Sequence, residues 1–277
     1  MEFTTIQQAK KDTGLSYIGG VNLSSKMKKN MKVSHQYTYA IYLAPSKQSG
    51  YNVCSHSTPE CRLGCLNTSG RAGMELIAGK TKTSNCRIRK TRLFYEHPEY
   101  FIAWMISEIK MYKRKAVKKG YYFSVRLNCT SDIDWANVLI NGQNIFEIFP
   151  DVNFYDYTKN SNKFNNKPNN YHLTFSFTGR NWNLCEALLK TGHNIAMIFN
   201  IKNKNTFPSM YKGYPIINGD LTDYRIADAQ GVIVGLNWKH IANKEVEKQI
   251  LQSCFVIQPD DINCNHVAAN VQENILI

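Results

Sequence analysis

Strand-like and helix-like segments alternate along this chain, and that alternation constrains its fold more than any other feature. Runs rich in aromatic and β-branched residues predict strands over residues 36–43, 121–128, 153–157, 171–177, 194–200 and 231–236. Helical patterns lie between several of these runs, as over 184–190. Strands separated by helices are typical of crossover connections within a parallel sheet. The sequence therefore predicts an α/β fold, a partial or complete (β/α) barrel with mostly parallel strands.

The longest predicted helical region covers residues 74–119 and contains one proline, Pro98. Proline suits the first turn of a helix, so we expect one helix to end near His97 and another to begin at Pro98. The basic run over 113–119 would face the negative end of the helix dipole, and Gly120 would end the helix. The second helix is expected to bury one apolar stripe, formed by Phe101, Ile102, Met105, Ile109 and Tyr112.

No linker divides the chain, so a single domain over residues 1–277 is predicted. Its parts are a turn-rich N-terminal lead (1–35), a βα core (36–240) and a C-terminal extension (241–277). The lysines over 26–32 in the lead are interpreted as a solvated surface or a contact to phosphate.

Three cysteines follow the first predicted core strand within one short polar loop. Cys54, Cys61 and Cys65 are spaced Cys-x6-Cys-x3-Cys, with mostly glycine, serine, threonine and proline around them. Such a loop has little apolar surface of its own, so a bound metal would organise it. Three thiolates are one short of a closed zinc site, whereas soft sulfur ligands suit an iron–sulfur cluster. We therefore expect a [4Fe-4S] cluster with one iron open to a small molecule.

Alternatives to the cluster remain open at this stage. Cys86 or His56 would complete a zinc site, and a disulfide or a chance grouping would need no metal at all. Cys264 and His266 form a second candidate metal pair near the C-terminus. The other cysteines, Cys129, Cys185 and Cys254, lie in or beside predicted core elements and are expected to be buried.

Polar side chains follow several predicted strands at the point where each strand ends. In folds built from βα units the reactive groups gather at the carboxyl ends of the strands, where the cysteine loop would also lie. Residues of these types also cap helices, which is the ordinary alternative. The residues predicted to line a pocket there are Asn128, Ser131, Asp132, Asp156, Lys159 and Thr178.

Composition narrows the setting and the partners. The net charge of +13 makes nucleic acid one candidate partner, although lysine- and asparagine-rich sequences are also typical of AT-rich genomes. No apolar run reaches the roughly 20 residues that span a bilayer, and the N-terminus lacks a secretory pattern. We expect a cytoplasmic protein, where clustered cysteines indicate metal binding or catalysis more often than disulfides.

The first core strand, the three-cysteine loop directly after it and the successive βα units resemble the radical S-adenosylmethionine (SAM) architecture. The segment Gly231–Gly235 is similar to a strand motif near the adenine in that family. The spacing of the cysteines is wider than the family's usual Cys-x3-Cys-x2-Cys. This resemblance implies a partial barrel, a [4Fe-4S] cluster and SAM as the ligand of its open iron.

About half of the chain also resembles a phage and mobile-element family, the gene product eighty-eight domain. That resemblance implies a viral or plasmid setting in the bacterial cytoplasm, and it brings no established reaction. The segments that carry it are Asn52–Cys54, Cys61–Thr68, Gly70–Arg71, Arg89–Phe94, Arg126–Ile133 and Phe149–Lys159.

The leading hypothesis is a phage-type iron–sulfur protein that is a candidate radical-SAM-like enzyme. The arginines Arg71, Arg89 and Arg92 would hold anionic groups near the loop or be ordinary surface side chains. The alternatives are a zinc-stabilised nucleic-acid-binding protein and an enzyme that uses the cluster as a Lewis acid. No phosphate-binding Gly-x-x-x-x-Gly-Lys-Ser/Thr motif and no His-Glu-x-x-His motif occurs.

Overall fold

The computed structural model describes residues 5–65, 78–79, 81–203, 206–241 and 243–258. Its centre is a ten-stranded sheet in the order β1-β2-β3-β4-β5-β6-β9-β8-β7, with β10 paired to β6. The parallel strands are β2 (Gln36–Ile41), β3 (Tyr122–Arg126), β4 (Asn153–Thr158), β5 (Tyr171–Ser176), β6 (Asn194–Phe199), β8 (Tyr214–Asn218), β9 (Ile233–Asn237) and β10 (Val256–Ile257). Two short strands pair antiparallel at the ends of this order, β1 (Gly19–Val21) and β7 (Met210–Tyr211).

The prediction of an α/β fold with mostly parallel strands is confirmed. The six strands predicted from the sequence correspond to β2, β3, β4, β5, β6 and β9. The sheet is open, because β1 and β7 each pair with a single neighbour at the two ends of the strand order. Of the two predicted forms, partial and complete, the complete barrel is therefore not formed by the described strands.

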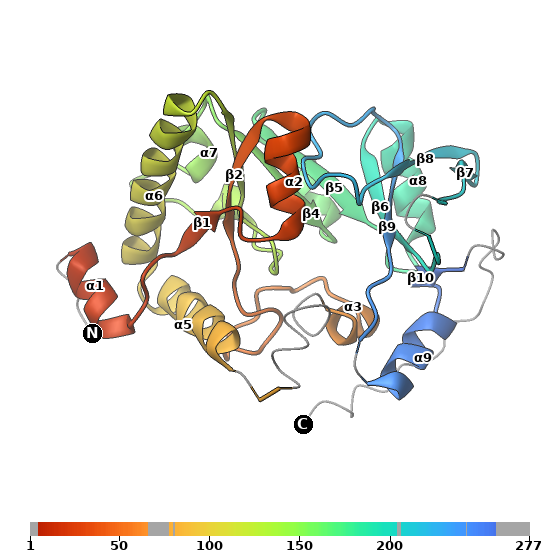
Figure 1. The fold of residues 1–277 in the computed structure, drawn as a ribbon, viewed down its shortest axis with the longest axis horizontal. Helices are drawn as coiled ribbons and strands as arrows, with labels where there is room; N and C mark the ends of the chain where they lie inside the picture. Colours follow the sequence, from red (N-terminus) through yellow and green to blue (C-terminus); the bar gives the residue numbers. More distant parts are fainter. Residues whose placement is uncertain (1–4, 66–77, 80, 204–205, 242, 259–277) are drawn as a thin grey trace.

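Helices cover both faces of the sheet (Figure 1). They are α1 (Ile6–Thr13), α2 (Ser25–Ser34), α3 (Pro59–Leu63), α5 (Lys82–Glu96), α6 (Pro98–Lys118), α7 (Ile145–Ile148), α8 (Trp182–Lys190) and α9 (Lys244–Gln252), with 3₁₀ turns η1 (Trp135–Asn137) and η2 (Ser161–Phe164). The hydroxyl of Thr38 in β2 accepts from Asn30 of α2, whereas that of the next residue, Tyr39, donates to Glu108 of α6. Successive side chains of a strand point to opposite faces, so α2 and α6 lie on opposite sides of the sheet.

The predicted helix break is confirmed, since α5 ends at Glu96 and α6 begins at Pro98. Four stripe residues of α6, Phe101, Ile102, Met105 and Ile109, are buried in the largest apolar cluster. Of the helices in the described ranges, none combines the length and apolar character needed to cross a bilayer.

The N-terminal lead is more ordered than predicted, because it contains α1, β1 and α2 within the described residues. The lysine cluster over 26–32 belongs to α2, whose N-cap Ser24 accepts a hydrogen bond from the Met27 amide. The C-terminal extension contributes β10, which pairs with the second half of β6 beyond the residues that pair with β5. Part of the helical region predicted over 74–119, namely 74–77 and 80, lies outside the described residues.

Glu108 links α6 to the N-terminal strand and to β2. Its carboxylate accepts hydrogen bonds from the amides of Ile18 (3.0 Å) and Gly19 (2.8 Å) and from the Tyr39 hydroxyl (2.7 Å). Burial raises the pKa of Glu108, and these three donors oppose that shift. The carboxylate therefore satisfies two buried backbone amides and one buried hydroxyl.

We predict that Glu108→Ala lowers the free energy of unfolding by about 3 kcal/mol, because it leaves buried amides without an acceptor. Urea denaturation of the two proteins measures this. The exposed Glu99, in the first turn of the same helix, provides the control. Glu99→Ala should change the value by less than about 0.5 kcal/mol. Equal effects of the two substitutions would contradict the assigned role of Glu108.

Candidate functional site

The cysteine loop leaves β2 and crosses the carboxyl edge of the sheet. The Thr130 hydroxyl donates to the Leu43 carbonyl (2.6 Å), and the Asp132 amide donates to the Val53 carbonyl (2.7 Å). On the other side the Ala44 amide donates to the Thr91 hydroxyl of α5 (2.9 Å). The loop is thus held between the segment that follows β3 and a helix. The predicted meeting of the cysteine loop with the exit of β3 is observed.

Cys54 is half-buried at this contact. Its sulfur accepts from the Ser46 amide (3.5 Å) and lies 3.8 Å from the Thr130 carbonyl. Burial raises the pKa of the Cys54 thiol to about 11, and Cys61 and Asp132 act in the same direction. Without a bound metal this sulfur is protonated at neutral pH.

Cys61 lies in α3, the short helix inside the loop. Thr58 caps this helix by accepting from the Cys61 amide (3.3 Å), and Pro59 occupies its first turn. Cys65 follows directly after Gly64, the residue that ends this helix. The structure holds Cys54, Cys61 and Cys65 as thiols rather than disulfides.

Lys159, directly after β4, connects the cysteine loop to the rest of the edge. Its ammonium interacts electrostatically with Cys61, Cys54 and Asp132. Burial alone would lower the pKa of Lys159, but Cys61 and Asp132 outweigh it and raise this pKa above its ordinary value. Two of the three cysteines therefore lie near one positive charge.

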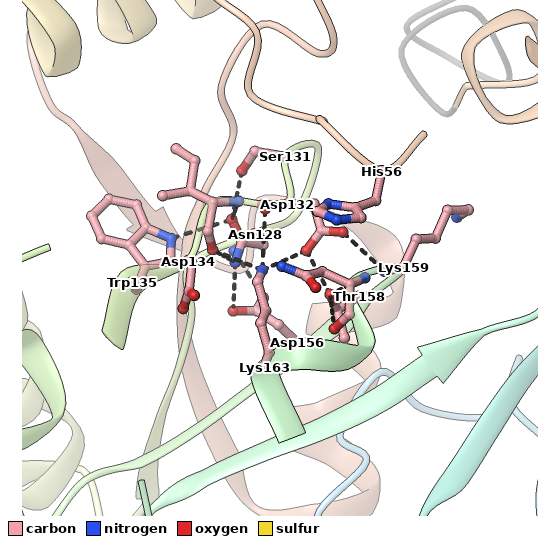
Figure 2. A network of polar contacts seen from close by, with 12 residues as sticks. His56, Asn128, Ser131, Asp132, Asp134, Trp135, Asp156, Thr158, Lys159 and Lys163 are labelled. Carbon is pink, nitrogen blue, oxygen red and sulfur yellow. Dashed lines mark hydrogen bonds and ion pairs between the residues drawn. The ribbon is translucent and has the colours of Figure 1, made fainter. Parts of the chain in front are cut away.

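Asp132 organises the polar network around Lys159 (Figure 2). Its carboxylate accepts from the Thr158 hydroxyl (2.7 Å), the Lys159 amide (2.9 Å) and the Lys163 ammonium (2.5 Å). Figure 2 also shows His56, from the cysteine loop, next to this network. The ends of β3 and β4 and the turn after β4 are thereby joined to the cysteine loop.

Asn128 and Asp156 form the buried base of the same network. The Asp156 carboxylate accepts from the Asn128 amide (2.8 Å) and the Tyr171 hydroxyl (3.0 Å). The Asn128 side-chain oxygen accepts from the Ser131 hydroxyl, the Ile133 amide and the Trp135 indole. These contacts fix the turn after β3. Asn128 and Ser131 therefore shape the carboxyl edge of the sheet.

Of the six predicted pocket residues, the structure brings five together: Asn128, Ser131, Asp132, Asp156 and Lys159. Thr178 lies instead beside a cavity of about 190 Å³, next to Glu60 and Arg180. Arg180 pairs with the buried Glu60 of α3 (2.8 Å). Thr178 therefore adjoins the helix that carries Cys61 rather than the Asp132 network.

Sequence analysis missed Lys163 and Glu60. Lys163 lies in an asparagine-rich turn to which the sequence assigns no role. Its side chain is nevertheless only 2% exposed and forms a salt bridge with Asp132. Glu60 looks like an ordinary residue of a helix first turn, but it is buried. No local pattern signals a buried charge, because its partner lies far along the chain.

Within the described residues, no three or more cysteine, histidine, aspartate or glutamate side chains are assembled as a metal-binding group. Cys86 lies on α5 and acts electrostatically on Tyr17 and Lys90. His56 is exposed, and its ring is 3.0 Å from the Ser55 hydroxyl.

The remaining predicted residues have mixed outcomes. Arg92 donates to the Ser49 carbonyl (3.1 Å), which helps hold the loop, and Arg89 is exposed. The predicted burial of Cys129, Cys185 and Cys254 is confirmed. Three predicted residues lie outside the described part of the chain: Arg71, Cys264 and His266.

The pH dependence of stability tests the state of Asp156. Burial raises its pKa to about 7, although Arg126 and the Asn128 amide act to lower it. The folded protein then keeps a proton that the unfolded chain releases above about pH 4, so this stabilising term is lost as the pH rises toward 7. The Asp156→Asn variant provides the reference, because its side-chain amide does not titrate in this pH range.

We predict that the unfolding free energy of the wild type, relative to Asp156→Asn, falls between pH 4 and 7 and is constant above. The slope should not exceed about 1.4 kcal/mol per pH unit, because one proton is involved. Urea unfolding of both proteins across this range measures it. A flat difference would show that Asp156 is ionised throughout.

Comparison with known proteins supplies the context for this site. Searches of curated proteins and of solved structures found no match. One family model, described as Gene product 88, matches residues 5–258. This match covers most of the chain, including the cysteine loop and every strand of the sheet. The chain therefore belongs to the Gene product 88 family.

Proposed function

We propose that this protein is an iron–sulfur protein of phage type, in which Cys54, Cys61 and Cys65 hold a [4Fe-4S] cluster with one open iron. The observation that carries the proposal is the arrangement of Cys54 and Cys61 around the Lys159 ammonium at the carboxyl edge of the sheet. Soft thiolates are the ligands that iron–sulfur clusters take.

The residues present fit such a cluster in their chemistry, and binding would have to draw the three side chains together, since the described residues are not assembled as a metal-binding group. All three cysteines are thiols in a single loop, and the loop is anchored to β3 and α5. The Lys159 ammonium would offset part of the negative charge of a thiolate-ligated cluster. Since the buried Cys54 thiol holds its proton tightly, the cluster would displace that proton when it binds.

The open iron would face a small molecule, for which SAM is the candidate that the sequence resemblance implies. When bound, the cluster would supply either an electron for the reductive cleavage of SAM or a Lewis acid. Asp132 would keep Lys159 in position through the Lys159 amide, and the Thr158 and Lys163 contacts would hold Asp132. The open, mostly parallel sheet is compatible with the partial barrel of radical-SAM-like proteins.

We predict that protein purified without oxygen, or reconstituted with iron and sulfide, contains about four irons per chain. Cys54→Ser, Cys61→Ser and Cys65→Ser should each lower the iron and sulfide content at least severalfold, because each removes a soft ligand. Iron and sulfide analysis with an absorption spectrum measures this. Cys86→Ser is the matched control, a half-buried cysteine on α5 that should leave the iron content unchanged.

Other results would identify the alternatives. A colourless protein with one zinc per chain, lost in Cys86→Ser or His56→Ala, would support the zinc site instead. Protein that stays free of iron after reconstitution would contradict the cluster.

The SAM hypothesis has its own test. With the cluster loaded and reduced, SAM should be converted to 5′-deoxyadenosine, and Cys54→Ser should abolish the product. A loaded cluster that binds SAM without forming 5′-deoxyadenosine would favour the Lewis-acid enzyme. Chromatographic analysis of the reaction mixture distinguishes these results.

A second candidate function is a zinc-stabilised nucleic-acid-binding protein of a phage or plasmid. The net charge of +13 favours it, because lysine and arginine side chains neutralise phosphates. DNA binding that weakens steeply with salt and needs no iron would support this function. Either function would operate in the host cytoplasm if the protein is encoded by a phage.

A further inference from the structure

A second site candidate lies at the carboxyl edge of the sheet, away from the Asp132 network. A cavity of about 780 Å³ opens there between α2 and the segments that follow β6, β8 and β9. Its volume falls within the range of roughly 300–1,000 Å³ that is typical of small-molecule sites. The charged and titratable residues that line it are Lys26, Lys29, Lys202, Asp220, Lys239 and His240.

The strand order explains why a cavity forms at this place. From β2 to β6 the strands are neighbours in chain order, but β6 is followed in the sheet by β9 and then by β8. The order therefore reverses next to β9. In open parallel sheets, ligands bind outside the carboxyl ends of the strands at such a reversal.

Asp220 holds two of the lysines at one wall of the cavity. The Lys26 ammonium pairs with the Asp220 carboxylate (2.6 Å), and the Lys29 ammonium donates to the Asp220 carbonyl (3.1 Å). The other carboxylate oxygen of Asp220 accepts from the Asn237 amide at the end of β9 (2.8 Å). Asp220 is thus occupied by Lys26 and by the backbone of β9.

The lining also carries two lysines without an ion-pair partner among the described residues. Lys202 and Lys239 are exposed, and no carboxylate of the described residues lies within 4 Å of either ammonium. The lining therefore combines four lysines with one carboxylate, and that carboxylate is already paired. His240 pairs with Glu247 of α9 (2.7 Å) and is directed to that helix.

We propose that this cavity binds a phosphorylated small molecule of nucleotide size, with Lys202 and Lys239 contacting its phosphate groups. Ammonium groups on flexible side chains are common phosphate ligands, and the focused positive field would attract a multiply charged anion. A cavity of this volume encloses one nucleotide rather than a length of nucleic acid.

Trp238 separates the cavity from the cysteine loop. It lines the cavity, and its ring packs so closely on α3 that a Cβ at Gly64 would come within 2.9 Å of it. The indole donates to Glu247 (3.1 Å), which fixes its orientation. None of the three cysteines lines the cavity, so this proposal does not depend on a cluster.

Isothermal titration calorimetry of the full chain with ATP and with inorganic triphosphate tests the proposal. Both should bind saturably, and added salt should weaken the binding. The double variant Lys202→Gln/Lys239→Gln should bind about tenfold more weakly or worse, because it loses two charge-assisted contacts. The matched control is Lys110→Gln/Lys118→Gln, two exposed lysines on α6 at the other face of the sheet.

The control has the same net charge as the double variant and should bind like the wild type. Equal weakening in both variants would show a general charge effect and overturn the proposal. So would the absence of saturable binding. Tight binding of a twelve-nucleotide single-stranded DNA, with no binding of ATP or triphosphate, would also overturn it and indicate a nucleic-acid site.

Discussion

The contacts of Asp132 hold the carboxyl edge of this protein together. Its amide donates to the cysteine loop at Val53, while its carboxylate accepts from Thr158, Lys159 and Lys163. One residue therefore connects the segments after β2, β3 and β4. The position of Lys159 relative to Cys54 and Cys61 depends on this connection, since the amide of Lys159 is one of the groups that Asp132 binds.

A second set of buried polar contacts lies on the face of the sheet that α2 covers. It joins α2 to β2, β3 and β4 and to the segment after β8. Asn30 of α2 donates to Thr38 and Tyr155 and accepts from the Asp223 amide, and Asp223 pairs with Arg126 of β3 (2.7 Å). Such a buried ion pair stabilises little by itself, but leaving one partner alone is costly. This requirement keeps α2 and the segment after β8 on the same face, and that arrangement also forms the lysine-lined cavity.

The helices and strands that could be predicted are those marked by a regular spacing of apolar residues or by their local composition. The stripe of Phe101, Met105 and Ile109 recurs at helical spacing, and Pro98 marks the start of its helix. The strands β2 to β6 are similarly apparent from their composition. Turns and lysines dominate the sequence of the lead, so its helices α1 and α2 are not apparent from it. The prediction left a partial and a complete barrel open, because sequence alternation does not show whether the end strands meet.

Sequence alone determined the class of this protein: an α/β chain with parallel strands, a cysteine-rich loop at the strand ends and membership of one family. Those properties follow from local patterns and motifs. Only the tertiary structure decided which polar groups meet. Lys163 reaches Asp132 across 31 positions, and Lys26 reaches Asp220 across 194. Such pairs depend on strand order and on which face each segment covers, and neither is encoded in a local pattern.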